Sequence, residues 1–230
     1  MADSPFQHSR ARIDRAGQVF REWWRSDDPA DSVPAEEYEV VLSFRRAHEL
    51  PMSTTTANLD RLLLDMSSEE WFMSNRLKRF PQILQKLDAR PTLRLSTFND
   101  VAGCRVVGPD PLLEDLLGMM QSTLDVLDVD DYRTRPRATG YRAVHVVVRE
   151  AGCRVEVQLP TPTENRWAAW IEDLARINVL HFLKDGKGPD DVVELARAVS
   201  DELAAGTMSH EALEEIRVRL ATRFAKCSSD

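Results

Sequence analysis

Two alternating segments carry the side chains best suited to chemistry: residues 141–148 and 154–159, separated by Ala151–Gly152. Side chains of a strand point to opposite faces with a period of two, and Ala-Gly between such segments predicts a hairpin. The expected pairing sets residue 145 opposite 158 and residue 147 opposite 156. The chemically useful side chains then converge on one surface: Tyr141, His145, Glu156 and Gln158. The alternation fits a site or a plain solvated sheet face.

A second carboxylate, Asp100, begins an otherwise apolar run that ends at Val107. A carboxylate at the edge of a buried strand is either a cap for a neighbouring turn or a metal ligand, and the residue alone favours the cap. Magnesium bound to phosphates uses one or two carboxylates, which Asp100 and Glu156 could supply from neighbouring strands. Glu156 could instead act as a general base on a substrate hydroxyl.

Basic residues are concentrated in two stretches of a chain whose net charge is −8. Residues 76–105 contain seven basic and two acidic residues, and residues 133–154 contain six basic and one acidic. The acidic total argues against nucleic-acid binding through bulk electrostatics, whereas local basic stretches indicate anion binding, with phosphate the obvious anion. Because no GxxxxGK[ST] pattern is present, side chains rather than a glycine-rich loop would hold that phosphate.

Apolar periodicity predicts the elements that must position these residues. Helices are expected at 6–25, 35–50, 54–66, 81–87, 112–123, 167–183, 190–205 and 209–224, and strands at 71–78, 97–107, 124–128 and the hairpin. Residues 184–189 are expected to form a linker, and Pro51 to close the second helix. The predicted fold class is α/β (α+β), with a small mixed central sheet flanked by helices. Three regions are expected: 1–68, an N-terminal helical segment; 69–205, the catalytic domain; 206–230, a C-terminal helix and tail.

Three widely spaced cysteines, without a CxxC or Cys/His pattern, predict reduced thiols and no zinc site. No apolar run is long enough to span a bilayer, and the N-terminus lacks a secretory signal. A cytoplasmic location is therefore expected.

Four short motifs follow one another in a familiar order: RLK at 76–78 with Ile83 and Lys86, DVAGCRV at 100–106, RPRATGYRAVH at 135–145, and VEVQLPT at 155–161 with Trp167, Ala168 and Glu172. Together they resemble the synthetase domain of the RelA/SpoT alarmone synthetase family, and above all its single-domain small alarmone synthetases. The resemblance covers residues 71–198 and implies a nucleotidyltransferase-like fold.

Members of that family transfer the pyrophosphate of ATP to the 3′-hydroxyl of a guanine nucleotide and release AMP. The resemblance implies that Asp100 holds Mg²⁺, with Glu156 as second ligand or base. It also implies a donor set in which Arg76 and Arg105 hold the adenine and Lys78 and Lys86 contact the ATP phosphates. The implied acceptor set places Tyr141 on the acceptor base, His145 and Gln158 beside it, and Arg137 on its phosphates.

The departures from the family motifs lie on the acceptor side or its supports: Gln82, Thr139, Ala143, Pro160 and Glu164–Asn165. The acceptor therefore stays open between GDP or GTP and an adenine nucleotide, and a homo-oligomer is one expected assembly. The alternative is a toxin that pyrophosphorylates the 3′ end of tRNA and has a protein antitoxin, with the arginines at 133, 135 and 142 holding the RNA backbone. A non-catalytic nucleotide-binding module is the third interpretation.

Overall fold

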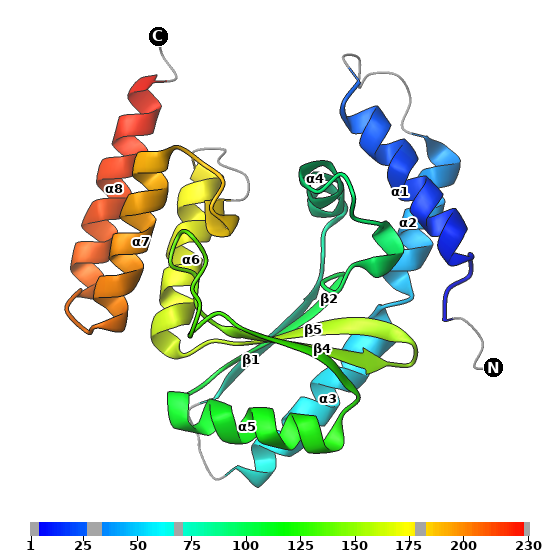
Figure 1. Ribbon diagram of the computed structural model, residues 1–230, viewed down its shortest axis with the longest axis horizontal. Helices are drawn as coiled ribbons and strands as arrows, with labels where there is room; N and C mark the ends of the chain where they lie inside the picture. Colours follow the sequence, from blue (N-terminus) through cyan, green and yellow to red (C-terminus); the bar gives the residue numbers. More distant parts are fainter. Residues whose placement is uncertain (1–4, 27–33, 67–70, 178–182, 228–230) are drawn as a thin grey trace. The chain divides into compact units, whose positions relative to one another are not determined.

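A five-stranded sheet carries the predicted hairpin (Figure 1). The computed structural model describes residues 5–26, 34–66, 71–177 and 183–227. The strands, in the order β1-β2-β5-β4-β3, are β1 (Phe72–Leu77), β2 (Ala102–Val107), β5 (Cys153–Leu159), β4 (Val144–Glu150) and β3 (Val126–Asp131). β2 and β5 are parallel, with Gly103 opposite Glu156 and Arg105 opposite Gln158. A mixed sheet flanked by helices confirms the predicted fold class.

The hairpin turn lies at the predicted position, because Ala151 and Gly152 both have positive φ, 47° and 78°. Two successive positive φ values are typical of the type I′ turn that joins two strands directly. The first strand is shorter than predicted, since β4 begins at Val144. Residues 141–143 belong to a loop whose backbone bonds to itself: the Arg137 N–H donates to the Tyr141 carbonyl.

Contacts divide the chain into two compact units, and the first comprises residues 1–106, 114–129 and 146–158. Its helices are α1 (Arg10–Trp24), α2 (Ala35–Arg46), α3 (Glu49–Asp65), α4 (Phe80–Ala89) and most of α5 (Asp110–Thr123), with a 3-10 turn η1 (Leu95–Thr97). In this unit α3 and α5 lie on one face of the sheet and α4 on the other (Figure 1). A buried cluster that includes Ile13, Phe20, Phe44, Leu87 and Phe98 joins the helices around α4.

Two element boundaries differ from the prediction for identifiable reasons. Pro51 lies in the first turn of α3 rather than after a helix. A proline is tolerated there because its missing N–H would have had no partner within the helix. The predicted strand at 97–107 loses its first residues to η1 and the segment that follows, so β2 begins at Ala102.

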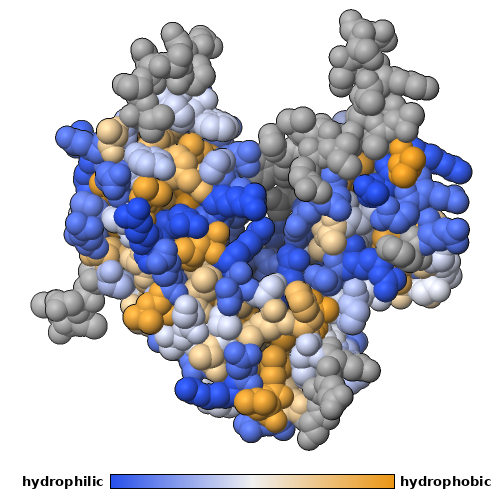
Figure 2. Space-filling model, turned by 180° about the vertical axis from the view of Figure 1, so that it is seen from behind, coloured by the Kyte–Doolittle hydropathy of each residue, from blue (hydrophilic) through white to orange (hydrophobic). Residues whose placement is uncertain are grey.

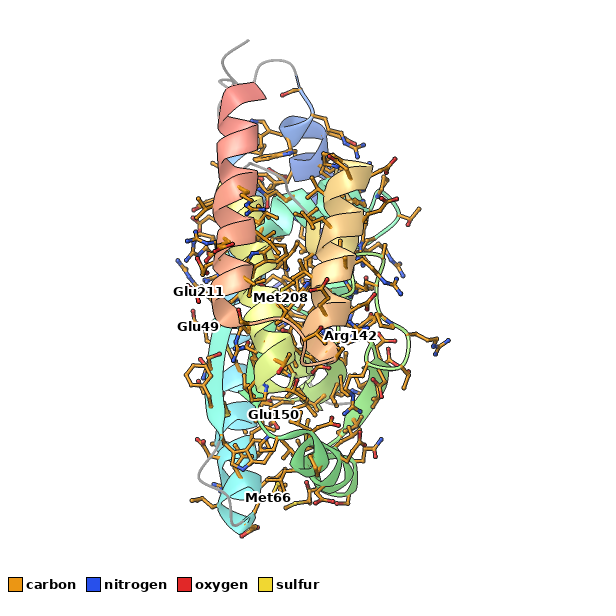
Figure 3. The ribbon with its side chains drawn as sticks, turned by 90° about the vertical axis from the view of Figure 1, so that its left-hand side faces the viewer. Glu49, Met66, Arg142, Glu150, Met208 and Glu211 are labelled. Atoms are coloured by element: carbon orange, nitrogen blue, oxygen red, sulfur yellow. The ribbon has the colours of Figure 1, made fainter. Side chains whose placement is uncertain are left out.

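The second unit comprises residues 107–113, 130–145 and 159–230. It contains α6 (Pro162–Ile177), η2 (Leu183–Asp185), α7 (Asp190–Ala204) and α8 (His210–Cys227), and Figure 3 shows the three α-helices side by side. Its core packs α6 and α7 through Trp167, Ile171 and Val199. α6 begins at a capping box, since the Thr161 hydroxyl accepts the Glu164 N–H at 3.2 Å and the Glu164 carboxylate accepts the Thr161 N–H at 2.8 Å. The division at 68 and 205 stays a prediction.

Figure 2 shows one face of the molecule, on which hydrophilic residues are widespread and hydrophobic ones form separate groups. Within the described residues, no helix is long and apolar enough to cross a membrane. Cys104 and Cys153 are buried free thiols. Burial raises the pKa of both thiols, that of Cys153 to about 11, so both are protonated at neutral pH.

One buried histidine makes the stability of the first unit depend on pH. His48 is 1% exposed, packs against Phe6 and Phe44, and donates from Nδ1 to the Phe44 carbonyl at 2.8 Å. Burial lowers the pKa of His48, although that hydrogen bond opposes the effect. The unfolded chain therefore binds this proton more readily than the folded protein does. The contribution is present at neutral pH and is lost as pH falls below about 6.5, the unfolded value.

We predict that the free energy of unfolding in urea drops more between about pH 7.5 and about pH 5.5 in the wild type than in His48→Leu. The variant cannot take up the proton, so this part of the drop disappears. His8→Leu, in the same N-terminal segment, is the control and should behave as the wild type. An equal drop in wild type and His48→Leu would contradict the prediction.

Candidate functional site

Asp100 lies at the centre of a charge cluster in the first unit. Each of its carboxylate oxygens accepts one ammonium group, from Lys78 Nζ and from Lys86 Nζ, both at 2.6 Å. All three side chains are 18–19% exposed. Lys78 follows β1, and its N–H donates to the Val101 carbonyl at 2.8 Å, which brings the end of β1 to the start of β2. The carboxylate thus binds two cations, in contrast to the turn cap that the residue alone favoured.

Burial and charge act against each other in this cluster. Burial, the largest single effect on Asp100, raises the pKa of the carboxyl, but Lys78 and Lys86 together outweigh it and hold that pKa below its ordinary value. The pKa of Lys86 is lowered, because burial exceeds the opposing attraction of Asp100. The charge of Glu156 acts on both groups and raises the pKa of Asp100. Glu156 is therefore near enough to share one electrostatic site with them.

Strand alternation puts the predicted donor residues on one face of the sheet. Asn75 Nδ2 donates to Thr56 Oγ1 of α3 at 3.1 Å, and Cys104 Sγ lies 3.5 Å from the same oxygen. These two side chains point to the α3 face. Since neighbours in a strand point to opposite faces, Arg76 and Arg105 point to the other face, which α4 covers (Figure 1).

On that same face a chain of hydrogen bonds links β2 to β5. Arg105 Nη2 donates to Gln158 Oε1 at 3.0 Å, and Gln158 Nε2 donates to Glu156 Oε2 at 2.7 Å. The parallel register sets Arg105 directly opposite Gln158. The structure thus brings Glu156 and Gln158 together as the alternation predicts, and adds Arg105 to them.

The residues present fit a cation that shares its coordination with a substrate. Within the described ranges, no group of three or more His, Cys, Asp and Glu side chains is placed to hold a metal ion. Asp100 and Glu156 interact electrostatically. Magnesium on a phosphate takes one or two protein carboxylates and completes its shell with water and phosphate oxygens. Two carboxylates beside two ammonium groups match that requirement.

A second cluster, in the second unit, surrounds Tyr141. The Tyr141 hydroxyl lies 2.6 Å from His145 Nε2, and the Arg137 guanidinium carbon lies 5.4 Å from the centre of the ring. The structure therefore joins three of the predicted acceptor residues, while Gln158, the fourth, bonds in the first unit. Lys184 Nζ lies 4.4 Å from the centre of the same ring and also pairs with Glu172 at 3.1 Å.

Lys184 belongs to this cluster, although the sequence predicts only a linker at residues 184–189. Tyr141 is only 2% exposed and packs in the core with Trp167. Because Tyr141 is buried and Arg137 and Lys184 lie over its ring, an acceptor base can stack on Tyr141 only if neighbouring side chains move. Nothing in the spacing of residues along the chain indicated this arrangement.

Several departures from the family motifs have roles in the framework. Thr139 is fully buried and donates to the Lys184 carbonyl at 3.0 Å. Gln82 accepts the Arg79 N–H at 3.3 Å and so caps α4. The Pro160 carbonyl accepts the Gly108 N–H at 3.4 Å. All three residues therefore form hydrogen bonds with the backbone, in segments that adjoin predicted site residues.

Two of the three arginines proposed to hold an RNA backbone form ion pairs within the second unit. Arg133 pairs with Asp131 at 3.0 Å and with Asp110 at 3.2 Å. Arg142 pairs with Asp201 at 2.8 Å. Arg135 is exposed. Two of the three guanidinium groups therefore already have carboxylate partners.

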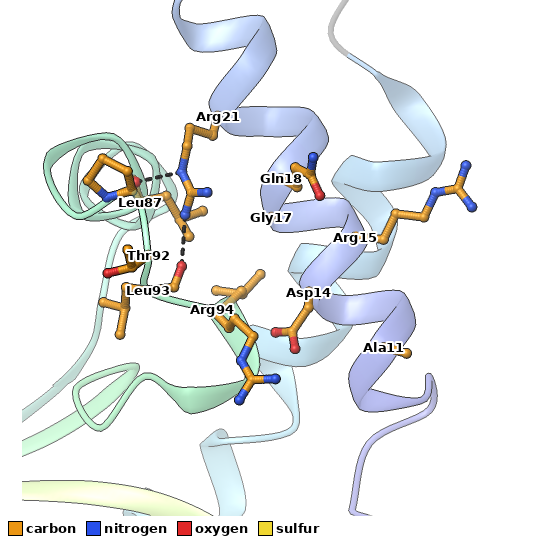
Figure 4. Close-up of a pocket in the computed structure, with 12 residues that line it drawn as sticks. Ala11, Asp14, Arg15, Gly17, Gln18, Arg21, Leu87, Thr92, Leu93 and Arg94 are labelled. Atoms are coloured by element: carbon orange, nitrogen blue, oxygen red, sulfur yellow. Dashed lines mark hydrogen bonds between the residues drawn. The ribbon is translucent and has the colours of Figure 1, made fainter.

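A hollow of about 520 Å³ lies in the first unit between α1 and residues 91–95 (Figure 4). It contains none of the predicted site residues. At its edge Arg21 donates to the carbonyls of Leu87 at 2.8 Å and Leu93 at 2.7 Å (Figure 4). A Cβ on Gly17 would lie 2.9 Å from Leu95 Cβ, so α1 needs glycine to approach η1. These contacts fasten α1 to the end of α4, the helix that carries Lys86.

Comparison with known proteins gives one matching family and several similar proteins. Residues 75–175 match the family described as "Region found in RelA / SpoT proteins". A mycobacterial relative, "Uncharacterized protein Rv1366" of Mycobacterium tuberculosis, is 38% identical over 114 residues, 47% of this chain and 41% of that protein. The chain thus spans about two fifths of the length of that relative. "GTP pyrophosphokinase YjbM" of Bacillus subtilis is 28% identical over 160 residues, 64% of this chain and 71% of that protein.

A solved structure shows the same fold. The small alarmone synthetase 1 of Bacillus subtilis, in a crystal structure with its product pppGpp, superposes with a TM-score of 0.59 at 22% identity, over 80% of this chain and 98% of that chain. Residues 75–175 are therefore similar to the region that RelA and SpoT proteins share, and the chain has the fold of this small alarmone synthetase.

Proposed function

We propose that this chain is an ATP-dependent pyrophosphokinase that transfers the β,γ-pyrophosphate of ATP to the 3′-hydroxyl of a purine nucleotide, forming an alarmone such as (p)ppGpp. One observation carries the proposal: Asp100 binds two lysine ammonium groups, and the charge of Glu156 acts on the same cluster. The family match and a relative named GTP pyrophosphokinase support it.

The reaction needs positioning and charge neutralisation more than covalent chemistry. The acceptor 3′-oxygen attacks the β-phosphorus, the bond from that phosphorus to the oxygen shared with the α-phosphorus breaks, and AMP leaves with that oxygen. Lys78 and Lys86 would neutralise the phosphate oxygens. Mg²⁺, when held by Asp100 and Glu156, supplies further neutralisation. Glu156 is also available as the base that takes the hydroxyl proton.

The two clusters suggest separate binding tasks. Arg76 and Arg105 share the face of the Asp100 cluster, so we assign them to the adenine of ATP. Arg137, Tyr141 and His145 are assigned to the acceptor, whose base would replace a cation on the Tyr141 ring. A purine nucleotide is favoured over the 3′ end of tRNA because Arg133 and Arg142 are already paired with carboxylates.

The test is an acceptor panel with purified protein, Mg²⁺ and ATP labelled in the β-phosphate. GDP, GTP, AMP, ADP and deacylated tRNA are offered separately. We expect label on a purine nucleotide, with AMP formed in equal amount. Label on tRNA alone would contradict the proposal and indicate the toxin, for which a protein antitoxin would be sought. Absence of transfer to any of these acceptors would contradict the proposal and favour a non-catalytic nucleotide-binding module.

We predict that Asp100→Asn lowers the transfer rate by about 100-fold or more, because it removes the charge that holds both lysines and would hold the cation. Asp88→Asn is the matched control: Asp88 lies on the same helix as Lys86 but pairs with Arg25 at the surface, and its rate should stay near wild type. Circular dichroism checks that both variants are folded. A fully active Asp100→Asn would refute the metal assignment.

Glu156→Gln tests the second carboxylate with little change in shape. The glutamine oxygen can still accept the hydrogen bond of Gln158, but it cannot take up a proton. We expect kcat to fall by about 100-fold while the KM for ATP changes by less than about threefold. Near-normal kcat in this variant would exclude Glu156 from the chemical step.

A further inference from the structure

The loop that carries Arg137 and Tyr141 is fastened to α7 by one arginine and one serine. Arg142 Nη1 donates to the Gly140 carbonyl at 3.2 Å and to Ser200 Oγ, and Arg142 Nη2 donates to Asp201 Oδ1 at 2.8 Å. Ser200 Oγ in turn donates to the Gly140 carbonyl at 2.6 Å. In Figure 3 Arg142 lies beside the C-terminal half of α7. We call Arg142, Ser200 and Asp201 the α7 clamp.

The backbone of this loop is shaped for close contact with α7. Gly140 has a φ of +85°, and the Gly140 N–H donates to the Arg137 carbonyl at 2.8 Å. A Cβ on Gly140 would lie 2.5 Å from Ser200 Cβ and 3.3 Å from Arg197 Cα. A side chain at 140 would therefore push the loop away from the helix, and only glycine adopts this φ at little cost.

Ser200 and Asp201 are both bonded within the clamp. The Ser200 side chain is buried, and its hydroxyl uses its one hydrogen on Gly140 while it accepts from Arg142. The hydrogen bond from Arg142 is the main cause of a lowered pKa of Asp201, so this carboxylate is ionised at neutral pH. Arg197 adds a weaker contact to Asp201 at 3.6 Å.

We propose that the α7 clamp positions the acceptor-binding loop: it holds residues 137–142 in the conformation that keeps Arg137 over the Tyr141 ring and the Tyr141 hydroxyl beside His145, the cluster assigned to the acceptor. The inference rests on the proposed function. Ser200 and Asp201 lie beyond residue 175, where the family match ends. Acceptor affinity in this protein would thus depend on a helix outside the family region.

A clamp that only stabilised the second unit would behave differently. Loss of a purely structural contact lowers stability and disturbs both substrates or neither. A positioning role changes acceptor binding and spares ATP, whose proposed contacts lie in the first unit. The ratio of the two KM values therefore separates these roles.

The test uses Arg142→Lys and Ser200→Ala in the full chain. Lysine keeps the charge of Arg142 but cannot reach three acceptors as a planar guanidinium does. With the acceptor that supports transfer in the panel, we expect the acceptor KM to rise about tenfold and the KM for ATP to change by less than about twofold. The control is Arg149→Lys. Arg149 lies in β4 and forms an exposed ion pair with Asp125, so this variant should leave both KM values unchanged. Equal rises in both KM values, or none, would overturn the proposal.

Two measurements need no turnover. Calorimetry with GDP should show about tenfold weaker binding in both variants. Hydrogen exchange should be faster for the amides of Arg137 and Gly140, with exchange in α4 unchanged. A wild type that fails to transfer pyrophosphate would refute the proposed function, whereas unchanged exchange at residues 137–142 in both variants would refute the clamp whatever the activity.

Discussion

The ion pairs of Asp100 with Lys78 and Lys86 are the central interaction of the candidate site in the first unit. They bring together the end of β1, the start of β2 and one face of α4. Removing one partner of a largely buried charge set leaves another charge uncompensated, at a cost of about 3–5 kcal/mol. Apolar packing could hold these elements together with less electrostatic cost. The charged arrangement is therefore better explained by a ligand that exchanges with it, as phosphate oxygens and a divalent cation would.

The surrounding structure keeps that cluster in place. Arg21 fastens α1 to the end of α4, and Gly17 lets the helix approach η1 closely. Strand alternation then places Arg105 and Glu156 on the face that α4 covers. The second unit uses the same kinds of contact for a different purpose, since the α7 clamp fixes the loop that carries Arg137 and Tyr141. Each cluster thus has its own supporting contacts. Two of the residues that differ from the RelA/SpoT motifs contribute to them: Thr139 bonds to the Lys184 backbone, and Gln82 caps α4.

Local patterns predicted much of the fold, because they depend on neighbours in the chain. The alternation of Glu156 with its neighbours, the turn at Ala151–Gly152 and most helices follow from such patterns. The predicted start of the first hairpin strand was wrong: Gly140 turns the backbone and the Tyr141 carbonyl accepts the Arg137 N–H within the loop, so β4 begins only at Val144. The prediction that Pro51 closes a helix was wrong, because a proline is as compatible with the first turn of a helix as with the position after its end. The resemblance named Lys78, Lys86 and Asp100, but their mutual binding depends on tertiary packing. Lys184 and Ser200 gave no signal for the same reason.

The binding of ATP with and without Mg²⁺ tests the central claim most directly. If Asp100 holds the cation that accompanies ATP, calorimetry on the wild type should show about tenfold or more weaker ATP binding in EDTA than in Mg²⁺. In Asp100→Asn the two lysines would bind ATP without their carboxylate competitor, so the affinity in EDTA should be at least that of the wild type and Mg²⁺ should change it little. A variant that keeps the full Mg²⁺ dependence of the wild type would contradict the account.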